Sequence, residues 1–213
     1  MKIDKQRAVL GTALAVALAA AGCATMQQQG PDDTEKAAIA LMKKDFKSHG
    51  QATVDRLNQD DVQALCTEYS GDRALPADVA KRIEQEQLAT VKYPADGDYM
   101  GDWKKGEKIA QTGVGKQWSD KPNAPSGGNC YACHELTKQE LSFGTVGPSL
   151  YHFGRARGFT AETQKYVYGK VYNPQAFAAC SSMPRFGHSG ILTEEQIKDV
   201  VALLMDPHSP VNQ

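Results

Sequence analysis

The sequence predicts an all-α protein. Apolar side chains recur every three or four residues in several segments, as they do along one face of an α-helix. Residues that cap helices, aspartate and threonine, stand directly before three of these segments. No run of alternating polar and apolar residues indicates a β-strand. We therefore expect a helical domain preceded by a helical extension.

The 213 residues are enough for one main domain with an appendage. The 24 basic and 25 acidic residues give a formal net charge of -1. This balance provides no overall field that would attract nucleic acid, so we expect no nucleic-acid partner. The sequence divides into a signal peptide at 1–22, a tether at 23–33, a helical extension at 34–98 and a main domain at 99–213.

The first residues have the pattern of a signal peptide. Three basic residues precede an uncharged run from Ala8 to Ala20, which is too short to span a bilayer. The small residues before Cys23 resemble a bacterial lipobox, in which cleavage leaves the cysteine to carry lipid. Ala20 stands where leucine is usual, so ordinary signal cleavage near Ala24 is the alternative. We expect a periplasmic protein that lipid on Cys23 anchors to a membrane.

The tether has no apolar period and is rich in glutamine, glycine and proline, which is typical of a linker. Folding should begin near Thr34. The extension contains three helical segments and no cofactor motif of its own. Apolar residues at helical spacing mark them: Ile39, Met42 and Phe46 in the first, Val62 and Leu65 in the second, and Val79 and Ile83, after Pro76, in the third.

The main domain opens with a helix that Asp102 can cap and whose inner face contains Trp103, Gly106 and Ala110. Glycine inside a helix costs about 1 kcal/mol, so Gly106 indicates that another helix crosses closely there. The last helix, which starts at Thr193, is the candidate partner. It has a capping box with Gln196 and one apolar face: Ile197, Val200, Val201 and Leu204.

A third helix is expected between these two. Thr160 can cap it, and the helix should continue through Val171. Asn173-Pro174 then ends it, because the residue before a proline avoids helical geometry.

The motif that carries chemistry is Cys130-Tyr131-Ala132-Cys133-His134. In Cys-x-x-Cys-His, two thiols one helical turn apart can each add to a haem vinyl group, while the adjacent imidazole reaches the iron. A zinc site would need a second pair of ligands, and a thioredoxin-type redox pair would need a strand leading into the motif. Neither is evident, so the sequence predicts one covalently attached haem c.

An iron-binding imidazole needs a partner for its other ring nitrogen. The segment Gly147-Pro148-Ser149-Leu150 is suited to supply a carbonyl to His134, because proline fixes the turn and brings no competing donor. An ordinary surface turn is the alternative for Pro148 and its neighbours.

The sixth iron ligand should be a methionine, since a Met/His pair raises the potential of electron-carrying cytochromes. The other methionines lie in the leader, in the tether, in expected helices or, for Met100, directly before the first helix of the main domain, so Met183 remains. It lies in a loop where Pro184 and Gly187 can hold an extended backbone. His152 and His188 are rival ligands that would lower the potential, and His152 is the stronger of the two.

Two cysteines, Cys66 and Cys180, remain once Cys23, Cys130 and Cys133 are assigned. Their compartment permits disulfides, so the hypothesis is that they pair and tie the extension to the loop ahead of Met183. Two free thiols, or Cys180 as a haem ligand, are the alternatives.

Several segments together are similar to the SoxX family of monohaem cytochromes. They are, in chain order, Gly128-Asn129-Cys130-Tyr131-Ala132-Cys133-His134, Gly144-Thr145-Val146-Gly147-Pro148-Ser149-Leu150-Tyr151, Met183-Pro184-Arg185-Phe186-Gly187 and Gly190-Ile191-Leu192-Thr193-Glu194-Glu195-Gln196-Ile197-Lys198-Asp199-Val200. The resemblance implies a class I cytochrome c fold over about Gly101 to Pro210, with His134 and Met183 as iron ligands.

The resemblance also implies partners. A SoxA-type cytochrome subunit would form a heterodimer with this chain, and that complex would join thiosulfate to a cysteine of the SoxYZ carrier as an L-cysteine S-thiosulfotransferase. Catalysis would lie in the SoxA subunit, with no catalytic residue here. This chain would pass electrons to a soluble cytochrome.

Two other functions remain open at this point. One is a freestanding, lipid-anchored cytochrome that carries electrons to a terminal oxidase or reductase. The other is an enzyme or gas sensor with an open iron site, in which Met183 would not bind iron.

Overall fold

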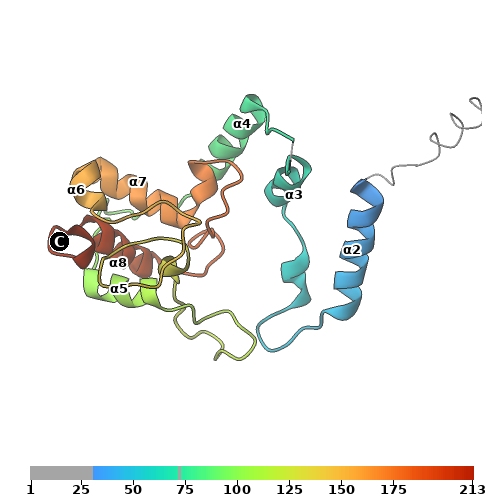
Figure 1. The fold of residues 1–213 in the computed structure, drawn as a ribbon, viewed down its shortest axis with the longest axis horizontal. Helices are drawn as coiled ribbons and strands as arrows, with labels where there is room; N and C mark the ends of the chain where they lie inside the picture. The colour runs from blue at the N-terminus through green and yellow to red at the C-terminus, as the bar shows by residue number, and fades with distance from the viewer. Residues whose placement is uncertain (1–30, 72) are drawn as a thin grey trace, which may run out of the picture. The chain divides into compact units, whose positions relative to one another are not determined.

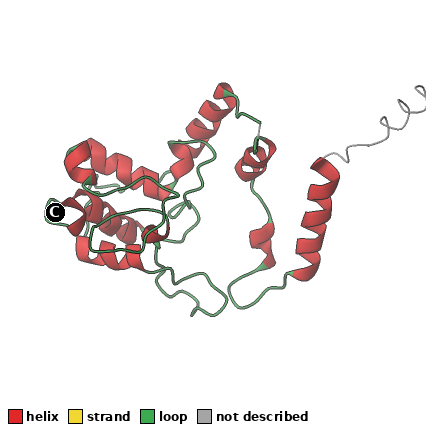
Figure 2. Ribbon diagram, in the orientation of Figure 1, coloured by secondary structure: helices red, strands yellow, loops and turns green. Residues whose placement is uncertain are grey.

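All regular secondary structure in residues 31–71 and 73–213, which the computed structural model describes, is helical (Figure 2). The one β-type contact in this part of the chain is an isolated bridge between His49 and Ala52. The predicted all-α class is therefore confirmed. The signal peptide, Cys23 and the tether up to residue 30 lie outside the described residues.

The chain forms two compact units, Met1–Lys47 and Ser48–Gln213. The boundary between them falls inside the extension that the sequence places at 34–98. The described part of the first unit consists of helix α2, Pro31–Asp45, and the two residues after it. It begins three residues before the expected start at Thr34, because the first turn of a helix needs no apolar residue and so leaves no period to detect.

The second unit contains the remaining elements of Figure 1. Its α-helices are α3 (Asp61–Glu68), α4 (Ala77–Leu88), α5 (Trp103–Gln111), α6 (Phe153–Arg157), α7 (Ala161–Tyr172) and α8 (Glu194–Met205). Single 3-10 turns are η1 (Val54–Leu57), η2 (Cys130–Ala132), η3 (Pro174–Ala176) and η4 (Pro210–Asn212).

The caps predicted for the main domain are confirmed. Asp102 accepts a hydrogen bond from the N–H of Lys104 at the start of α5, and Thr160 caps α7. Thr193 and Gln196 form the predicted capping box of α8. A second capping box, in which Asp60 precedes α3, was not predicted.

Helices α5 and α8 make the most extensive contact between described elements (Figure 1). A Cβ atom at Gly106 would lie 2.1 Å from the carbonyl oxygen of Asp199 and 3.1 Å from Cβ of Leu203. The two backbones therefore meet at a distance that only glycine permits. This confirms the crossing that the sequence indicated at Gly106.

Helix α8 forms the centre of the core. Seven of its residues are buried, including Ile197, Val201 and Leu203, which are fully enclosed. Burying each such side chain stabilises the fold by about 1.5–3 kcal/mol. Helix α7 packs on α8 and contributes Val167 and Val171 to the same core.

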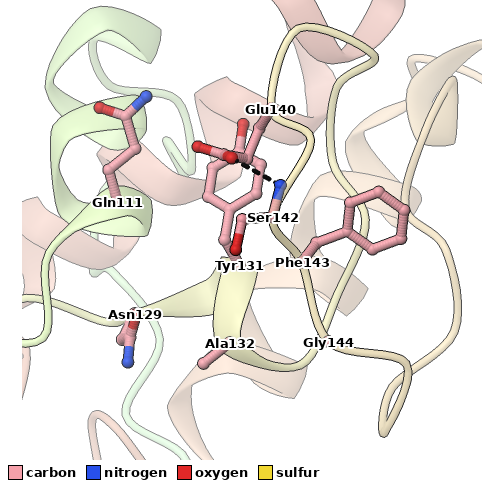
Figure 3. Close-up of a pocket in the computed structure, with 8 residues that line it drawn as sticks. All are labelled: Gln111, Asn129, Tyr131, Ala132, Glu140, Ser142, Phe143 and Gly144. Atoms are coloured by element: carbon pink, nitrogen blue, oxygen red, sulfur yellow. Dashed lines mark hydrogen bonds between the residues drawn. The ribbon is translucent and has the colours of Figure 1, made fainter.

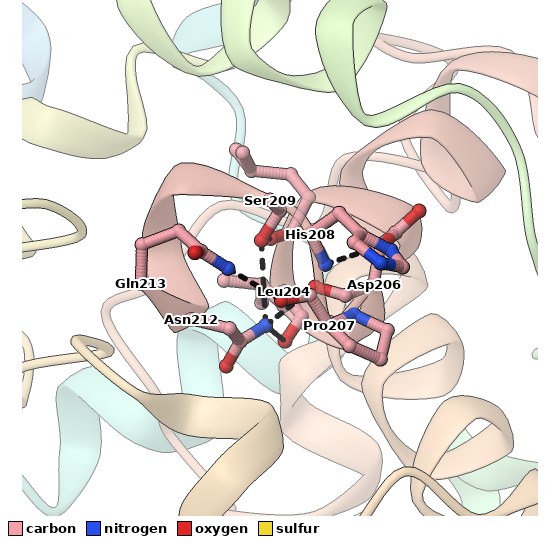
Figure 4. A network of polar contacts seen from close by, with 8 residues as sticks. Leu204, Asp206, Pro207, His208, Ser209, Asn212 and Gln213 are labelled. Atoms are coloured by element: carbon pink, nitrogen blue, oxygen red, sulfur yellow. Dashed lines mark hydrogen bonds and ion pairs between the residues drawn. The ribbon is translucent and has the colours of Figure 1, made fainter.

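The C-terminal segment closes the end of α8. The side-chain amide of Asn212 donates to the carbonyl oxygens of Leu204 and Asp206, at 3.1 and 2.9 Å (Figure 4). The hydroxyl of Ser209 donates to the carbonyl oxygen of Leu203 at 2.7 Å. These bonds satisfy carbonyl groups that have no partner within the helix.

Helix α6 was not predicted. It follows His152, which has a left-handed backbone (φ 58°) and whose N–H donates to the carbonyl oxygen of Val211 at 2.8 Å. No described helix is long and apolar enough to cross a membrane.

Replacing Gly106 with alanine should destabilise the protein, because the new methyl group would overlap the backbone of α8 at Asp199. We expect the free energy of unfolding to fall by about 1–3 kcal/mol or more, as overpacked cores do. Denaturant unfolding of the holoprotein measures this loss. The matched control is Lys105→Ala at the adjacent exposed position, and equal stability of both variants would contradict the close crossing.

Candidate functional site

The Cys-x-x-Cys-His motif forms a tight turn that starts with η2. The carbonyl oxygen of Cys130 accepts hydrogen bonds from the N–H groups of Cys133 and His134, at 3.1 and 2.9 Å. Cys130 and Cys133 form no disulfide. Burial raises the pKa of the Cys130 thiol to about 12, so this thiol is neutral until it is attached. Both cysteines are available to hold a haem.

The end of α5 fixes the position of this turn. The N–H of Gly128 donates to the carbonyl oxygen of Ile109 at 2.8 Å. The N–H of Asn129 donates to the carbonyl oxygen of Thr112 at 2.9 Å. A Cβ atom at Gly127 would lie 1.9 Å from the same Thr112 oxygen, so the approach requires glycine.

Tyr131, between the two cysteines, is buried, and its hydroxyl lies 3.2 Å from Oγ1 of Thr137. Burial raises the pKa of Tyr131, so its phenol remains neutral. A polar pocket of about 440 Å³ opens beside it, with Gln111, Asn129 and Glu140 among its lining residues (Figure 3). The lining of this pocket offers no thiol, thioether or imidazole to an iron.

The imidazole of His134 is oriented by the turn at 147–150. Its Nδ1 lies 2.7 Å from the carbonyl oxygen of Pro148. Because a carbonyl can only accept, Nδ1 carries the hydrogen and Nε2 keeps its lone pair, as an iron-binding imidazole requires. A Cβ atom at Gly147 would lie 2.2 Å from Cε1 of His134. The turn therefore packs on the imidazole as well as binding it.

A mostly apolar cavity of about 730 Å³ lies against the motif. Ligand pockets in proteins usually measure roughly 300–1,000 Å³. Cys130, Cys133 and His134 line the cavity from one segment, and Met183 lines it from another. Apolar side chains complete the wall: Leu150, Phe153, Val167, Val171, Phe186 and Leu204. Two thiols, an imidazole and a thioether on one apolar cavity fit a haem c.

The rival histidines do not line this cavity. Nε2 of His152 lies 2.6 Å from the carbonyl oxygen of Gln213, and its ring stacks on Tyr151. His188 is exposed. Among the described methionines, only Met183 lines the cavity.

Met183 lies in a loop between η3 and α8, which we call the Met183 loop (residues 178–187). The N–H of Met183 donates to Oγ of Ser181 at 3.3 Å. Three residues before it, Cys180 forms a disulfide with Cys66 of α3, with a Cα–Cα distance of 5.4 Å. The sulfur of Cys180 is therefore not free to bind iron.

The carboxylate of Asp60, directly before α3, has two partners. Its Oδ1 accepts from the N–H of Gln63 at 2.8 Å, and its Oδ2 accepts from the guanidinium of Arg185 in the Met183 loop. Burial alone would raise the pKa of Asp60. The two hydrogen bonds and the Arg185 charge outweigh burial and hold this pKa below its ordinary value of 3.8.

The other interpretations of Cys-x-x-Cys lack support in the described residues. No group of three or more histidine, cysteine, aspartate or glutamate side chains there could hold a metal ion such as zinc. The segment before the motif, 112–129, is loop, whereas a thioredoxin-type pair follows a strand.

The polar residues of the cavity wall that were not predicted include Arg157, Tyr166 and Lys170. Burial lowers the pKa of Lys170, and the nearby charge of Glu84 opposes that shift. The positive charges of Arg157 and Lys170 complement the carboxylates that a haem carries. Tyr166 and Lys170 stand one turn apart on α7, so their spacing was the signal that could have revealed them.

Comparison with known proteins agrees with this geometry. The family model for cytochrome c matches residues 103–206, from the start of α5 to the residue directly after α8. The chain is also similar to an uncharacterized lipoprotein of Aquifex aeolicus (strain VF5). The two are 40% identical over 158 residues, which is 73% of each chain.

Replacing Gly147 with alanine should displace the His134 imidazole, because the new methyl group would overlap the ring. We expect both cysteines to retain the haem, the reduction potential to shift, and the unfolding free energy to fall by about 1–3 kcal/mol. Potentiometry and denaturant unfolding of the holoprotein measure these effects. Thr145→Ala, at an exposed position of the same loop, is the control. A wild-type potential in Gly147→Ala would contradict the packing of the ring on residue 147.

The lowered pKa of Asp60 predicts an acid-sensitive contribution to stability. A carboxyl with a depressed folded pKa stabilises the fold above its unfolded pKa, and the contribution is lost as pH falls through the folded pKa. Wild type should therefore exceed Asp60→Asn in stability at pH 6, and the difference should shrink below about pH 3.8, the ordinary aspartate value. Urea unfolding across this range tests it, with Asp55→Asn as the control. A difference independent of pH would show that the Asp60 charge is not responsible.

Proposed function

The chain contains a cytochrome c domain at residues 103–206, which carries a covalently bound haem c and transfers electrons, and we propose that His134 and Met183 bind its iron. The observation that carries the proposal is that both side chains line one apolar cavity beside the two cysteines. Nε2 of His134 is left with its lone pair by the bond from Nδ1 to Pro148.

When bound, haem supplies an iron that gains or loses one electron. The chain's own residues determine how that iron is held. The Pro148 carbonyl increases the basicity of the His134 imidazole, and the apolar wall keeps water from the cavity. If His134 and Met183 both hold the iron, no position on it would remain for substrate, which favours electron transfer over chemistry at this site.

At a finer level, we propose that the chain is the electron-transfer subunit of a SoxAX-type complex. Four segments that are similar to the SoxX family support this assignment, two of them around His134 and one around Met183. In this proposal a SoxA-type subunit carries out the L-cysteine S-thiosulfotransferase reaction on the SoxYZ carrier. This chain accepts the electrons released there and passes them to a soluble cytochrome.

We also propose that the protein works in the periplasm, anchored by lipid on Cys23. The lipobox-like residues before Cys23 support an exported lipoprotein. The similar chain of Aquifex aeolicus is named a lipoprotein, which supports the proposed lipid anchor. An anchor followed by a tether would keep the haem domain at the membrane surface while it meets soluble partners.

Replacing Met183 with alanine should remove the thioether from the iron. We expect the oxidised holoprotein to lose its sulfur-to-iron absorption band, to bind added imidazole, and to show a lower reduction potential. Met100→Leu is the matched control, because Met100 packs against the core and does not line the cavity. A Met183→Ala protein that keeps the band would exclude Met183 as the ligand.

The partner assignment is tested by purifying the protein from its native membrane fraction. We expect a second cytochrome to co-purify, and thiosulfate to reduce this haem only when that cytochrome and the carrier are present. A stable monomer whose haem is indifferent to thiosulfate, but which reduces a terminal oxidase or reductase, would favour a freestanding shuttle instead.

A further inference from the structure

We propose that helix α3 clamps the Met183 loop and that Asp60 and Cys66 are positioning residues for the Met183 thioether. This inference rests on the proposed bond between Met183 and iron. It adds a role for the N-terminal part of the second unit, which lines neither pocket of the site.

The clamp has two points of attachment, one on each side of Met183. The disulfide joins Cys66 to Cys180, three residues before the methionine. The ion pair joins Asp60 to Arg185, two residues after it. Both attachments reach the loop from a remote part of the sequence, since 114 and 125 residues separate the partners.

A short, rigid element connects the two attachments. Asp60 is the N-cap of α3, and Cys66 lies within α3. At about 1.5 Å per residue, they are separated by about 9 Å along the helix. One oxygen of Asp60 completes the capping box with Gln63 while the other holds Arg185, so the start of the helix and the loop are fixed by one carboxylate. The two attachments to the Met183 loop therefore come from one rigid helix.

The Met183 loop needs such support because its own bonds near the methionine are local. Ser181 donates to the carbonyl oxygen of Ala178, and the N–H of Met183 donates to the Ser181 hydroxyl. Pro184 has no N–H to donate. Cys180 has a left-handed backbone (φ 59°), which a residue other than glycine adopts at a cost. Hydrogen bonds between neighbouring residues of a loop do not attach the loop to the rest of the fold, so they do not prevent the whole loop from opening.

Beyond Met183 the loop is tied to the haem domain itself. Phe186 is buried, and the N–H groups of Gly187 and His188 donate to the carbonyl oxygen of Tyr172, both at 3.1 Å. Before Met183, the long-range links in the described chain come from the extension. They are the Cys66–Cys180 disulfide and a hydrogen bond from the N–H of Ala179 to Oε1 of Glu84 in α4, at 3.1 Å.

The Asp60–Arg185 ion pair should hold the loop more firmly than an ordinary surface ion pair would. The Arg185 side chain is only 12% exposed, whereas that of Asp60 is 43% exposed. Losing the carboxylate would leave a mostly buried guanidinium without its acidic partner, which favours movement of residue 185 toward water. That movement would displace the backbone at residue 185, which is two residues after Met183.

The test measures how readily imidazole, added to the oxidised full-length holoprotein, displaces the Met183 sulfur. A loop that opens more often gives tighter apparent binding, since the competent state is more populated. We expect the Cys66→Ser/Cys180→Ser protein to bind imidazole about tenfold more tightly than wild type, with a weaker sulfur-to-iron band and a lower reduction potential. Wild-type holoprotein should behave in the same way after its disulfide is reduced with dithiothreitol, the two released thiols are blocked, the reductant is removed and the iron is re-oxidised with ferricyanide, which covers the case in which the double variant does not fold.

The ion pair is tested in the same assay. Asp60→Asn should bind imidazole more tightly than wild type, and Asp60→Glu, which keeps a carboxylate, should recover part of the wild-type behaviour. Glu68→Gln, an exposed position at the end of α3, is the matched control.

The outcomes separate this proposal from the function on which it rests. If the variants unfold more easily but keep the wild-type imidazole affinity, band and potential, the links only stabilise the fold and the clamp is wrong. If wild type itself has no sulfur-to-iron band, the proposed Met183 ligation fails and the clamp fails with it.

Discussion

The close crossing of α5 and α8 determines where the haem site can form. Because Gly106 has no side chain, α5 approaches the backbone of α8 and its C-terminal end has one position in the fold. The segment hydrogen-bonded to that end carries the attachment motif, and α8 holds the same segment where the Gln196 side chain donates to the Ser126 carbonyl oxygen. Helix α7, packed on α8, brings Val167 and Val171 to the cavity wall. One helix pair thus places both the motif and the wall of the cavity.

The parts of the fold that follow from local signals could be predicted from the sequence. Helices α5, α7 and α8 each have a capping side chain directly before an apolar period: Asp102, Thr160 and Thr193. Helix α6 could not be predicted, because its five residues show no period. It starts where His152 is held by Val211 near the other end of the domain, and a contact of that range leaves no mark in the neighbouring sequence.

The same distinction applies to the site. The attachment motif is local, and the proline at residue 148 indicated a free carbonyl beside the motif. The loop context of Met183 singled it out among the methionines. The links between Asp60 and Arg185, and between Glu84 and the backbone of Ala179, could not be predicted. Charged residues of these types are common on surfaces, and only the folded chain shows which of them meet.

The position of the disulfide has a consequence for how the protein is made. Cys130 and Cys133 lie between Cys66 and Cys180 in the sequence, so during export both haem thiols emerge after Cys66 and before its partner. Four cysteines allow three complete pairings, and each of the three ties up Cys130 and Cys133, either with each other or with Cys66 and Cys180. The native state, with one disulfide and two reduced haem thiols, is therefore none of the fully oxidised states. Maturation in an oxidising compartment therefore demands an order of events. Cys130 and Cys133 must be reduced when haem is attached, so a chain oxidised through either of them cannot take up its cofactor until that bond is reduced or exchanged.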